Sequence, residues 1–472
     1  MKTHKTRRWL LLSLLAVIAI AGFWIWASSP KGPDQIITTP DGSKFRFVGV
    51  TFSKEAVPPS IWVKFLRRLP DSWADSLRKR FGDHDSQYNI TQKWDQPQLI
   101  FWFQRLTTNA SSAAGRLQQQ RAFIPSAVLA DEAGMQAGAQ AYPILHDEVV
   151  WSFVYFPVVP KRSPTIECRF FQGAYREEAQ SSLGKVKIPN PLFGHFPNWQ
   201  PEPLPAVKKS GDLEVRLDEV AFGNPQSGAT ILRPNGTRAS PLRPITGGER
   251  IETQLDFSVR SSRGSNEGWV LQNSELSDAT GNVISEKSQT SWIGAQFAQR
   301  PQAVWQGMRD NLNAALWSNE SAWHLKMAFK RSFGFVSNEF VTFTNIPIPA
   351  MGLTNTNQMT VMVGSQKLIL GNFERHADIP SNMVGTFFSH MLTELTIELP
   401  NKSPDLAFDL WDVKTDQGEA NQFGRSEPAN SYTLTFRSIP TNATKMDLTF
   451  VLQKTRTVEF TFKPPKSSGE VP

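Results

Sequence analysis

The chain has 472 residues, of which 40% are hydrophobic and 20% are charged, a composition typical of a globular protein rather than a disordered one. This length allows roughly three domains of about 150 residues each. Much of the net charge of +7 lies at Lys2, Lys5, Arg7 and Arg8, since the remaining 46 Lys and Arg face 43 Asp and Glu. The chain therefore lacks the charge excess of a nucleic-acid-binding protein, and we expect no nucleic-acid partner.

Residues 9–27 form an apolar run that contains no charged side chain. As a helix the run would be about 28 Å long, close to the ~30 Å hydrocarbon core of a bilayer. The basic residues before it predict a cytoplasmic tail, 1–8, and an extracytoplasmic bulk. We expect a single-pass anchor in the bacterial cytoplasmic membrane, with the bulk in the periplasm. The alternative is a cleaved signal peptide ending near Ile25-Trp26-Ala27.

Cys168 is the single cysteine, so the chain contains no internal disulfide. For an exported protein this favours a bacterial envelope and domains that fold on core burial alone. Cys168 falls within a predicted strand and has no histidine close to it in sequence. We therefore expect it to be a small apolar side chain in or near the core, rather than a nucleophile.

The first predicted domain, 35–188, follows a short linker at 28–34 and contains short segments rich in aromatic and β-branched residues. Such segments, bounded by turn-forming residues, are typical of strands. The predicted strands are 44–53, 99–106, 122–129, 149–156, 165–172 and 184–188.

One segment of this domain, 61–81, has apolar residues at three- and four-residue steps and predicts an amphipathic helix kinked at Pro70. Its polar positions are mostly basic. The helix could lie on anionic lipid or close over a cleft. We favour the simpler interpretation, a helical insertion packed on a sheet with its charges in water.

A proline-rich linker, 189–205, separates the first domain from a second β domain, 206–346. Residues 278–282 predict a hairpin turn in the second domain. Residues 302–319 predict a short helical insertion. The predicted strands are 213–222, 251–260, 269–277, 283–284, 323–329 and 340–346.

The third β domain is predicted at 347–465, before a tail at 466–472. Its last two strands alternate most clearly and predict an antiparallel hairpin with a turn at 454–456. The predicted strands are 360–365, 392–400, 406–413, 431–439, 446–453 and 457–464.

A weak internal repeat connects the three domains. Residues 128–134 resemble 275–281, and 410–418 resemble both, with one residue fewer between the Asp and the Gly. One module used three times would bury three separate cores, although hairpin turns can also resemble one another by chance. The predicted fold is all-β: a transmembrane helix followed by three antiparallel β-sandwiches of the immunoglobulin or fibronectin type III kind, with short helical insertions.

The sequence contains none of the common nucleotide-binding, hydrolase or zinc-protease motifs. The seven histidines do not pair at metal-binding spacing. Two acidic clusters contain a histidine, Asp83-His84-Asp85 and His146-Asp147-Glu148. The first could hold a cation together with loop carbonyls, but we interpret it as an exposed polar loop and the second as a turn before a strand. Catalytic carboxylate pairs depend on distance in space, so none is assigned. We predict no catalytic, cofactor-binding or metal-binding residue and no cofactor.

The abundant aromatic residues, 15 Trp and 32 Phe, are the remaining feature. Most should lie in cores, but an exposed Trp on a sandwich could bind a sugar or a protein. We expect a membrane-anchored, non-enzymatic binding, scaffold or adhesion module whose partner is a protein or a glycan. The alternatives are an exported enzyme with accessory sandwich domains, for which carbohydrate is a candidate substrate, and a subunit of a membrane signalling complex.

Overall fold

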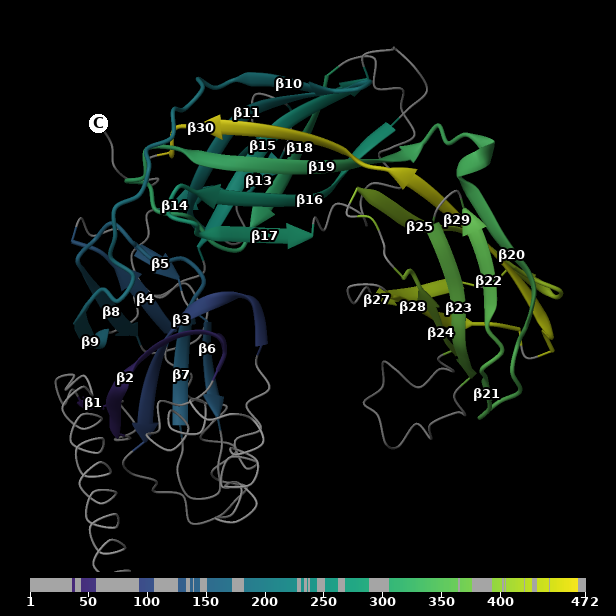
Figure 1. Ribbon diagram of the computed structural model, residues 1–472, viewed down its shortest axis with the longest axis horizontal. Helices are drawn as coiled ribbons and strands as arrows, with labels where there is room; N and C mark the ends of the chain where they lie inside the picture. The colour runs from purple at the N-terminus through teal and green to yellow at the C-terminus, as the bar shows by residue number, and fades with distance from the viewer. Residues whose placement is uncertain are drawn as a thin grey trace, which may run out of the picture.

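The fold is all-β and consists of several antiparallel sheets, as predicted (Figure 1). It is seen in a computed structural model. The structure describes residues 36–38, 44–56, 93–105, 126–132, 136–138, 140–144, 151–171, 182–226, 231–232, 236, 238–243, 251–261, 268–287, 305–363, 366–375, 393–400, 403, 405–419, 421–426, 431–440 and 442–465. Among these residues the one helical element is a 3-10 turn, η2 (Ser337–Glu339).

The first unit is a pair of sheets that face each other. One has the order β1 (Ile36–Thr38), β2 (Lys44–Glu55), β3 (Lys93–Arg105), β7 (Trp151–Phe156) and β6 (Gln140–Ile144). The other has the order β5 (Gln136–Gly138), β4 (Ser126–Ala130), β8 (Thr165–Phe171) and β9 (Ser182–Pro189). The rings of Phe103 and Phe170 meet edge to face between them, 5.0 Å apart.

The second unit is built in the same way. One sheet has the order β10 (Ala206–Ser210), β11 (Leu213–Pro225), β15 (Glu252–Ser261) and β18 (Gln306–Leu312), and β14 (Leu242–Arg243) also pairs with β11. The facing sheet has the order β17 (Val283–Lys287), β16 (Gly268–Asp278), β19 (Trp323–Phe333) and β30 (Arg456–Phe462). The short strands β12 (Ile231–Leu232) and β13 (Arg238–Ala239) pair separately. Phe257 and Phe329 connect the two large sheets through a ring contact of 5.9 Å.

The third unit also consists of two sheets. The first has the order β20 (Phe340–Pro347), β29 (Lys445–Lys454), β25 (Leu406–Thr415) and β26 (Gly418–Glu419). The second has the order β21 (Thr354–Asn355), β23 (Gln366–Arg375), β24 (Thr393–Glu398), β28 (Ser431–Ser438) and β27 (Asn421–Ser426), and β22 (Met359–Val363) also pairs with β23. Phe408 and Tyr432 are in ring contact between the sheets, at 4.9 Å.

The three units share one arrangement of strands. The series β2-β3-β7 corresponds to β11-β15-β18 and to β23-β24-β28, and the series β5-β4-β8-β9 corresponds to β17-β16-β19-β30 and to β26-β25-β29-β20. The three copies of the predicted repeat occupy equivalent hairpins, namely β4–β5, β16–β17 and β25–β26. The repeat therefore marks the same turn in each unit, including the turn predicted at 278–282.

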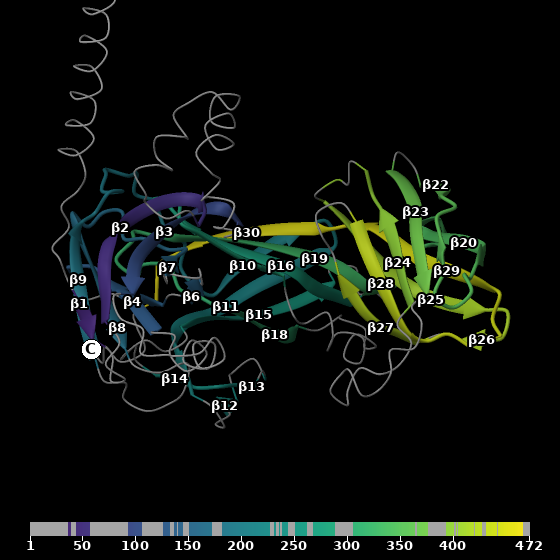
Figure 2. The ribbon, with the colours of Figure 1, turned by 90° about the horizontal axis from the view of Figure 1, so that it is seen from below.

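The third unit is inserted between two neighbouring strands of the second. β19 pairs with β30, and β20 pairs with β29, so the two connections between the units run side by side. Figures 1 and 2 show the yellow strand β30 beside β19 in the second unit, while β29 lies in the third. The predicted hairpin of the last two strands is wrong, because each pairs elsewhere. Likewise, β20 belongs to the third unit rather than to the end of the second.

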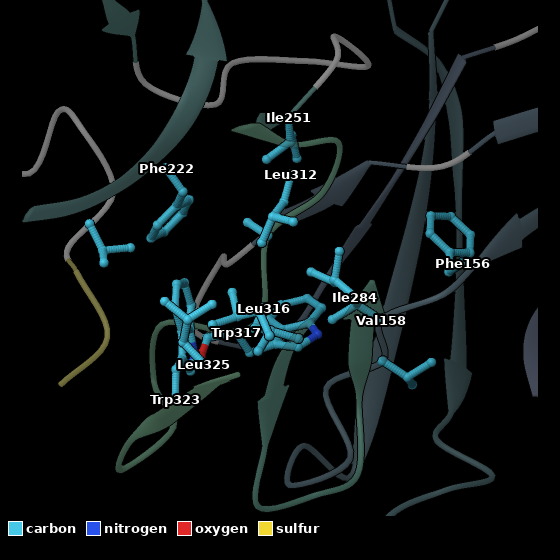
Figure 3. Packing of buried hydrophobic residues seen from close by; sticks show 14 of the residues in the cluster. Phe156, Val158, Phe222, Ile251, Ile284, Leu312, Leu316, Trp317, Trp323 and Leu325 are labelled. Atoms are coloured by element: carbon cyan, nitrogen blue, oxygen red, sulfur yellow. The ribbon is translucent and has the colours of Figure 1, made fainter. Parts of the chain in front are cut away.

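The cores do not follow the expected one-per-domain pattern. One cluster of buried apolar side chains spans both the first and the second unit. Phe156 and Val158 of the first unit join Ile284 and Trp317 of the second in this cluster (Figure 3). A separate cluster fills the third unit. A small third cluster, which includes Trp102 and Phe153, lies on β3 and β7. The first two units thus form one packed body, whereas the third has its own core.

Two predicted helices and the membrane anchor have different outcomes. Residues 306–312, within the helix predicted at 302–319, form strand β18, so that prediction is wrong. The anchor at 9–27 and the helix at 61–81 lie outside the described residues. Over the part of the chain that the structure describes, no helix has the length and hydropathy that a bilayer crossing requires.

Candidate binding surface

The residues that the sequence singled out do not form a catalytic centre in the described part of the chain. Cys168 is fully buried in the core, and burial raises the pKa of its thiol well above the ordinary value. The clusters at 83–85 and 146–148 lie outside the described residues. Among the described residues, no group of three His, Cys, Asp or Glu is placed to hold a metal ion.

The joint between the first and second units is a buried polar network around Asn282. Its side chain donates to the carbonyl of Val159 (2.9 Å) and accepts from the amide of Val159 (3.0 Å). It also donates to the carboxylate of Asp278 (2.8 Å), which accepts two further bonds from Thr280. Because buried polar groups need partners, this network fixes the 278–282 turn against the chain that leaves β7.

A second part of the same joint is charged. Arg162 contacts Glu320 at 2.9 Å, and the Glu320 side chain is only 3% exposed. Burial raises the pKa of Glu320 even though Arg162 opposes the shift. Lys161 donates to the carbonyl of Thr280 at 2.8 Å, and burial lowers the pKa of this lysine. Arg162 also donates to the carbonyls of Phe196 and Pro197, so the predicted linker 189–205 is held at the joint.

The joint between the second and third units is centred on Gln453, which is buried at 2% exposure. Its side chain bonds both the amide and the carbonyl of Arg331, each at 2.8 Å, and so imitates a strand-to-strand pair. Two ion pairs stand beside it, Lys330–Asp409 at 2.6 Å and Arg331–Glu339. These contacts bind the end of β19 to β25 and β29.

A bulge in β25 brings Trp411 to the outer face of the third unit. The register shifts between Leu410 and Asp412, so Trp411 is the extra residue opposite β29. Asp412 lies opposite Thr449 on the same face, whereas Leu410 points to the core with Phe450. Bulges commonly redirect a side chain in this way. As a result, Trp411 is 54% exposed.

Phe335 and Phe340 support this tryptophan, and the three rings together are called the Trp411 cluster below. Trp411 lies 5.3 Å from Phe335 and 5.7 Å from Phe340, both edge to face. The two phenylalanines are half-buried, and the adjacent Val336 is 53% exposed. Edge-to-face packing holds the indole in place while leaving much of it accessible to solvent.

Trp305 provides a contrast within the same chain. Arg216 and Arg260 lie over its ring, with guanidinium carbons 5.0 and 4.5 Å from the ring centroid. Each arginine has its own carboxylate partner, Asp218 or Glu214. Cation–π contacts of this kind occupy the faces of the indole. Trp305 therefore belongs to a surface network, whereas Trp411 is the more open ring.

The comparisons with known proteins leave the family open. No family model and no curated protein matches the chain. Two similar solved structures are an S-layer protein, rSbsC, with a TM-score of 0.13 and 10% identity, and domains 1–6 of the surface layer protein SbsC, with a TM-score of 0.12 and 11% identity. Each alignment covers 85% of this chain and 58% of the other. At these TM-scores the likeness carries no argument about fold or function.

The sequence analysis named an exposed tryptophan as a possible binding group but assigned no residue to that role. A usable signal was present in β25, where strict alternation fails because two residues, rather than one, lie between Leu410 and Val413, which face the same core. A break of one residue in an otherwise alternating strand is typical of a bulge. Phe335 and Phe340 gave no signal, since their contacts with Trp411 depend on how β20 and the segment before it lie in the sheet that contains β25.

Proposed function

We propose that this chain is a non-enzymatic binding and scaffold protein of the bacterial envelope. In this proposal residues 9–27 anchor it in the cytoplasmic membrane, and three β-sandwich units of the fibronectin type III kind stand outside. The shared strand arrangement supports the sandwich assignment, because three strands in one sheet and four in the other, in this order, are typical of that fold. The charge distribution around residues 9–27 supports the orientation.

The observation that carries the binding role is the exposed Trp411 cluster. Trp411 is more than half exposed, lies at a bulge and packs against two other rings. Since much of its apolar surface stays in contact with water, this arrangement adds less to stability than a buried tryptophan would. Exposed aromatic side chains that are held rigidly are typical anchors of binding surfaces, because they lose little side-chain entropy when a partner arrives. The surrounding ion pairs form a polar rim.

The two joints support the scaffold role. Asn282, Arg162 and Gln453 each satisfy polar groups of the neighbouring unit through buried or half-buried bonds. Units that are joined in this way keep a fixed orientation, whereas units on a free linker reorient. A rigid row holds the binding surface of the third unit at a set distance and direction from the first unit, which is the physical requirement of a scaffold.

Photo-crosslinking in the native host tests this function. A photoreactive residue at the exposed Val336, beside the cluster, is compared with one at Val207, which is equally exposed on β10. We expect membrane-associated protein, and an adduct from position 336 that is absent at position 207 and lost in a Trp411→Ala background. Recovery of the chain in the soluble fraction rather than with the membrane would contradict the proposal. The same adducts from both positions would contradict it as well.

A further inference from the structure

The outward side of strands β20, β29 and β25 beside Trp411, called the Trp411 face below, carries rows of polar side chains. These side chains indicate which ligand the face would bind, if it has the binding role proposed above. Thr342 lies opposite Thr449 across β20 and β29, and Thr449 lies opposite Asp412 across β29 and β25. The two hydroxyls are 3.0 Å apart. The row therefore presents two hydroxyls and a carboxylate directly beside the exposed indole.

The apolar part of this face is narrow. Phe335 and Phe340 are half-buried and pack nearly perpendicular to Trp411, which is the most exposed of the three rings. Val451, the next side chain of this face on β29, is fully buried. A stable protein–protein interface buries about 800 Å² on each partner around an apolar centre. A centre one ring wide fits a small ligand with one apolar face better than it fits a protein.

Most charged side chains of this face are paired, and positive charges are not in excess. Asp412 pairs with Lys414 at 2.7 Å, Asp409 with Lys330 at 2.6 Å, and Glu339 with Arg331. In the following row, Asp447 accepts a bond from the amide of Asn345 at 2.7 Å. The face thus offers donors and acceptors side by side but no excess of positive charge. A polyanion would find no net attraction here, whereas adjacent hydroxyls of a neutral ligand can donate to a carboxylate and accept from an ammonium group.

We infer that the Trp411 face binds a neutral glycan. A hexose has one face of C–H groups, which packs on an exposed indole, and an edge of hydroxyls, which reaches Thr342, Thr449 and the Asp412–Lys414 pair. Stacking supplies the apolar contact, and the paired charges supply bidentate hydrogen bonds.

The test measures binding of the full-length chain in detergent to three neutral tetrasaccharides: cellotetraose, chitotetraose and maltotetraose. Titration calorimetry and the fluorescence change of tryptophan give the affinity. We expect saturable binding of at least one probe and a loss of about tenfold or more in Trp411→Ala. Trp411→Phe should retain part of the affinity, because a ring remains. Val207→Ala, at an equally exposed position, should bind like the wild type.

The outcomes separate this inference from the proposed function. Absence of binding to all three probes, or equal binding by Trp411→Ala in a protein with unchanged near-ultraviolet circular dichroism, would overturn the glycan assignment. If position 336 nevertheless crosslinks to a protein in a Trp411-dependent manner, the binding role stands and its partner is a protein. If neither experiment depends on Trp411, both proposals fail.

Discussion

Replacing Asn282 with alanine should loosen the joint between the first two units. The substitution leaves the buried amide of Val159 without its acceptor and removes one donor from the buried carboxylate of Asp278. The carbonyl of Val159 still accepts from the amide of Lys161 at 2.9 Å, so it does not add to the loss. An unpaired buried amide costs about 1–3 kcal/mol, and a lost bond to a charged group costs a similar amount. We expect a total of roughly 2–6 kcal/mol.

Differential scanning calorimetry of the full-length protein measures this loss. The first two units share one core and the third has its own, so two transitions are expected. In Asn282→Ala, the transition of the shared core should move down by at least about 4 °C, while the transition of the third unit stays in place. The matched control is Asn198→Ala, an exposed position of the neighbouring linker. A change below about 0.5 kcal/mol, as for an ordinary surface substitution, would refute the reasoning.

Three further predictions concern the core and the joints. Cys168 should not react with a thiol reagent until denaturant is added, because burial excludes the reagent and raises the pKa of the thiol; reaction in the native state would contradict this. Gln453→Leu should speed hydrogen exchange at the Arg331 amide, because that amide loses its acceptor. Unchanged exchange would show that Gln453 does not hold this part of the joint between the second and third units. Burial raises the pKa of Glu320, so the stability that its protonation contributes is present at low pH and lost as pH rises through the raised value. Glu320→Gln, which retains a neutral side chain beside Arg162, should flatten this pH dependence in urea unfolding, and a steeper dependence would disprove it.

The strands could be predicted from the sequence because their inward side chains alternate, but the partners of the strands could not. Leu448, Phe450 and Leu452 share one face, as predicted, and Val458 and Phe460 share another. The first three enter the core of the third unit, whereas the last two enter the shared core of the first and second. Alternation shows that a face is buried, but it contains no information about which core buries it.

Strand β18 was missed because polar residues occupy core-facing and paired positions. Asp310 points toward the facing sheet and accepts a hydrogen bond of 2.5 Å from the hydroxyl of Ser274. On the other face, Arg309 forms an ion pair of 2.6 Å with Asp256 of β15. These groups are buried because their partners satisfy them. A scale of hydrophobicity treats each one as exposed, and the remaining apolar residues then happen to match a helical period.

The exposure of Trp411 could not be predicted from local sequence patterns either. The sequence predicts that most tryptophans lie in cores, although the bulge in β25 leaves a trace in the sequence. That Trp411 is more open than Trp305 depends on contacts between residues far apart in the chain. Arg216 and Arg260 lie over Trp305, whereas two phenylalanine rings pack nearly perpendicular to Trp411. Tertiary contacts of this kind are not encoded in local periodicity.

The order of strands in the third unit explains how it can be inserted without opening the second. An inserted unit must begin and end at the same place, because β19 and β30 remain neighbours in the sheet that it interrupts. In the four-stranded sheet of the first unit, the edge strand β9 is the last strand of the unit in sequence. The corresponding edge strand of the third unit, β20, is the first in sequence. Since β20 and β29 are antiparallel neighbours, the start of one lies beside the end of the other. Moving one strand from the end of the module to its beginning therefore brings both connections together, and it places Phe340 next to the joint where the Trp411 cluster forms.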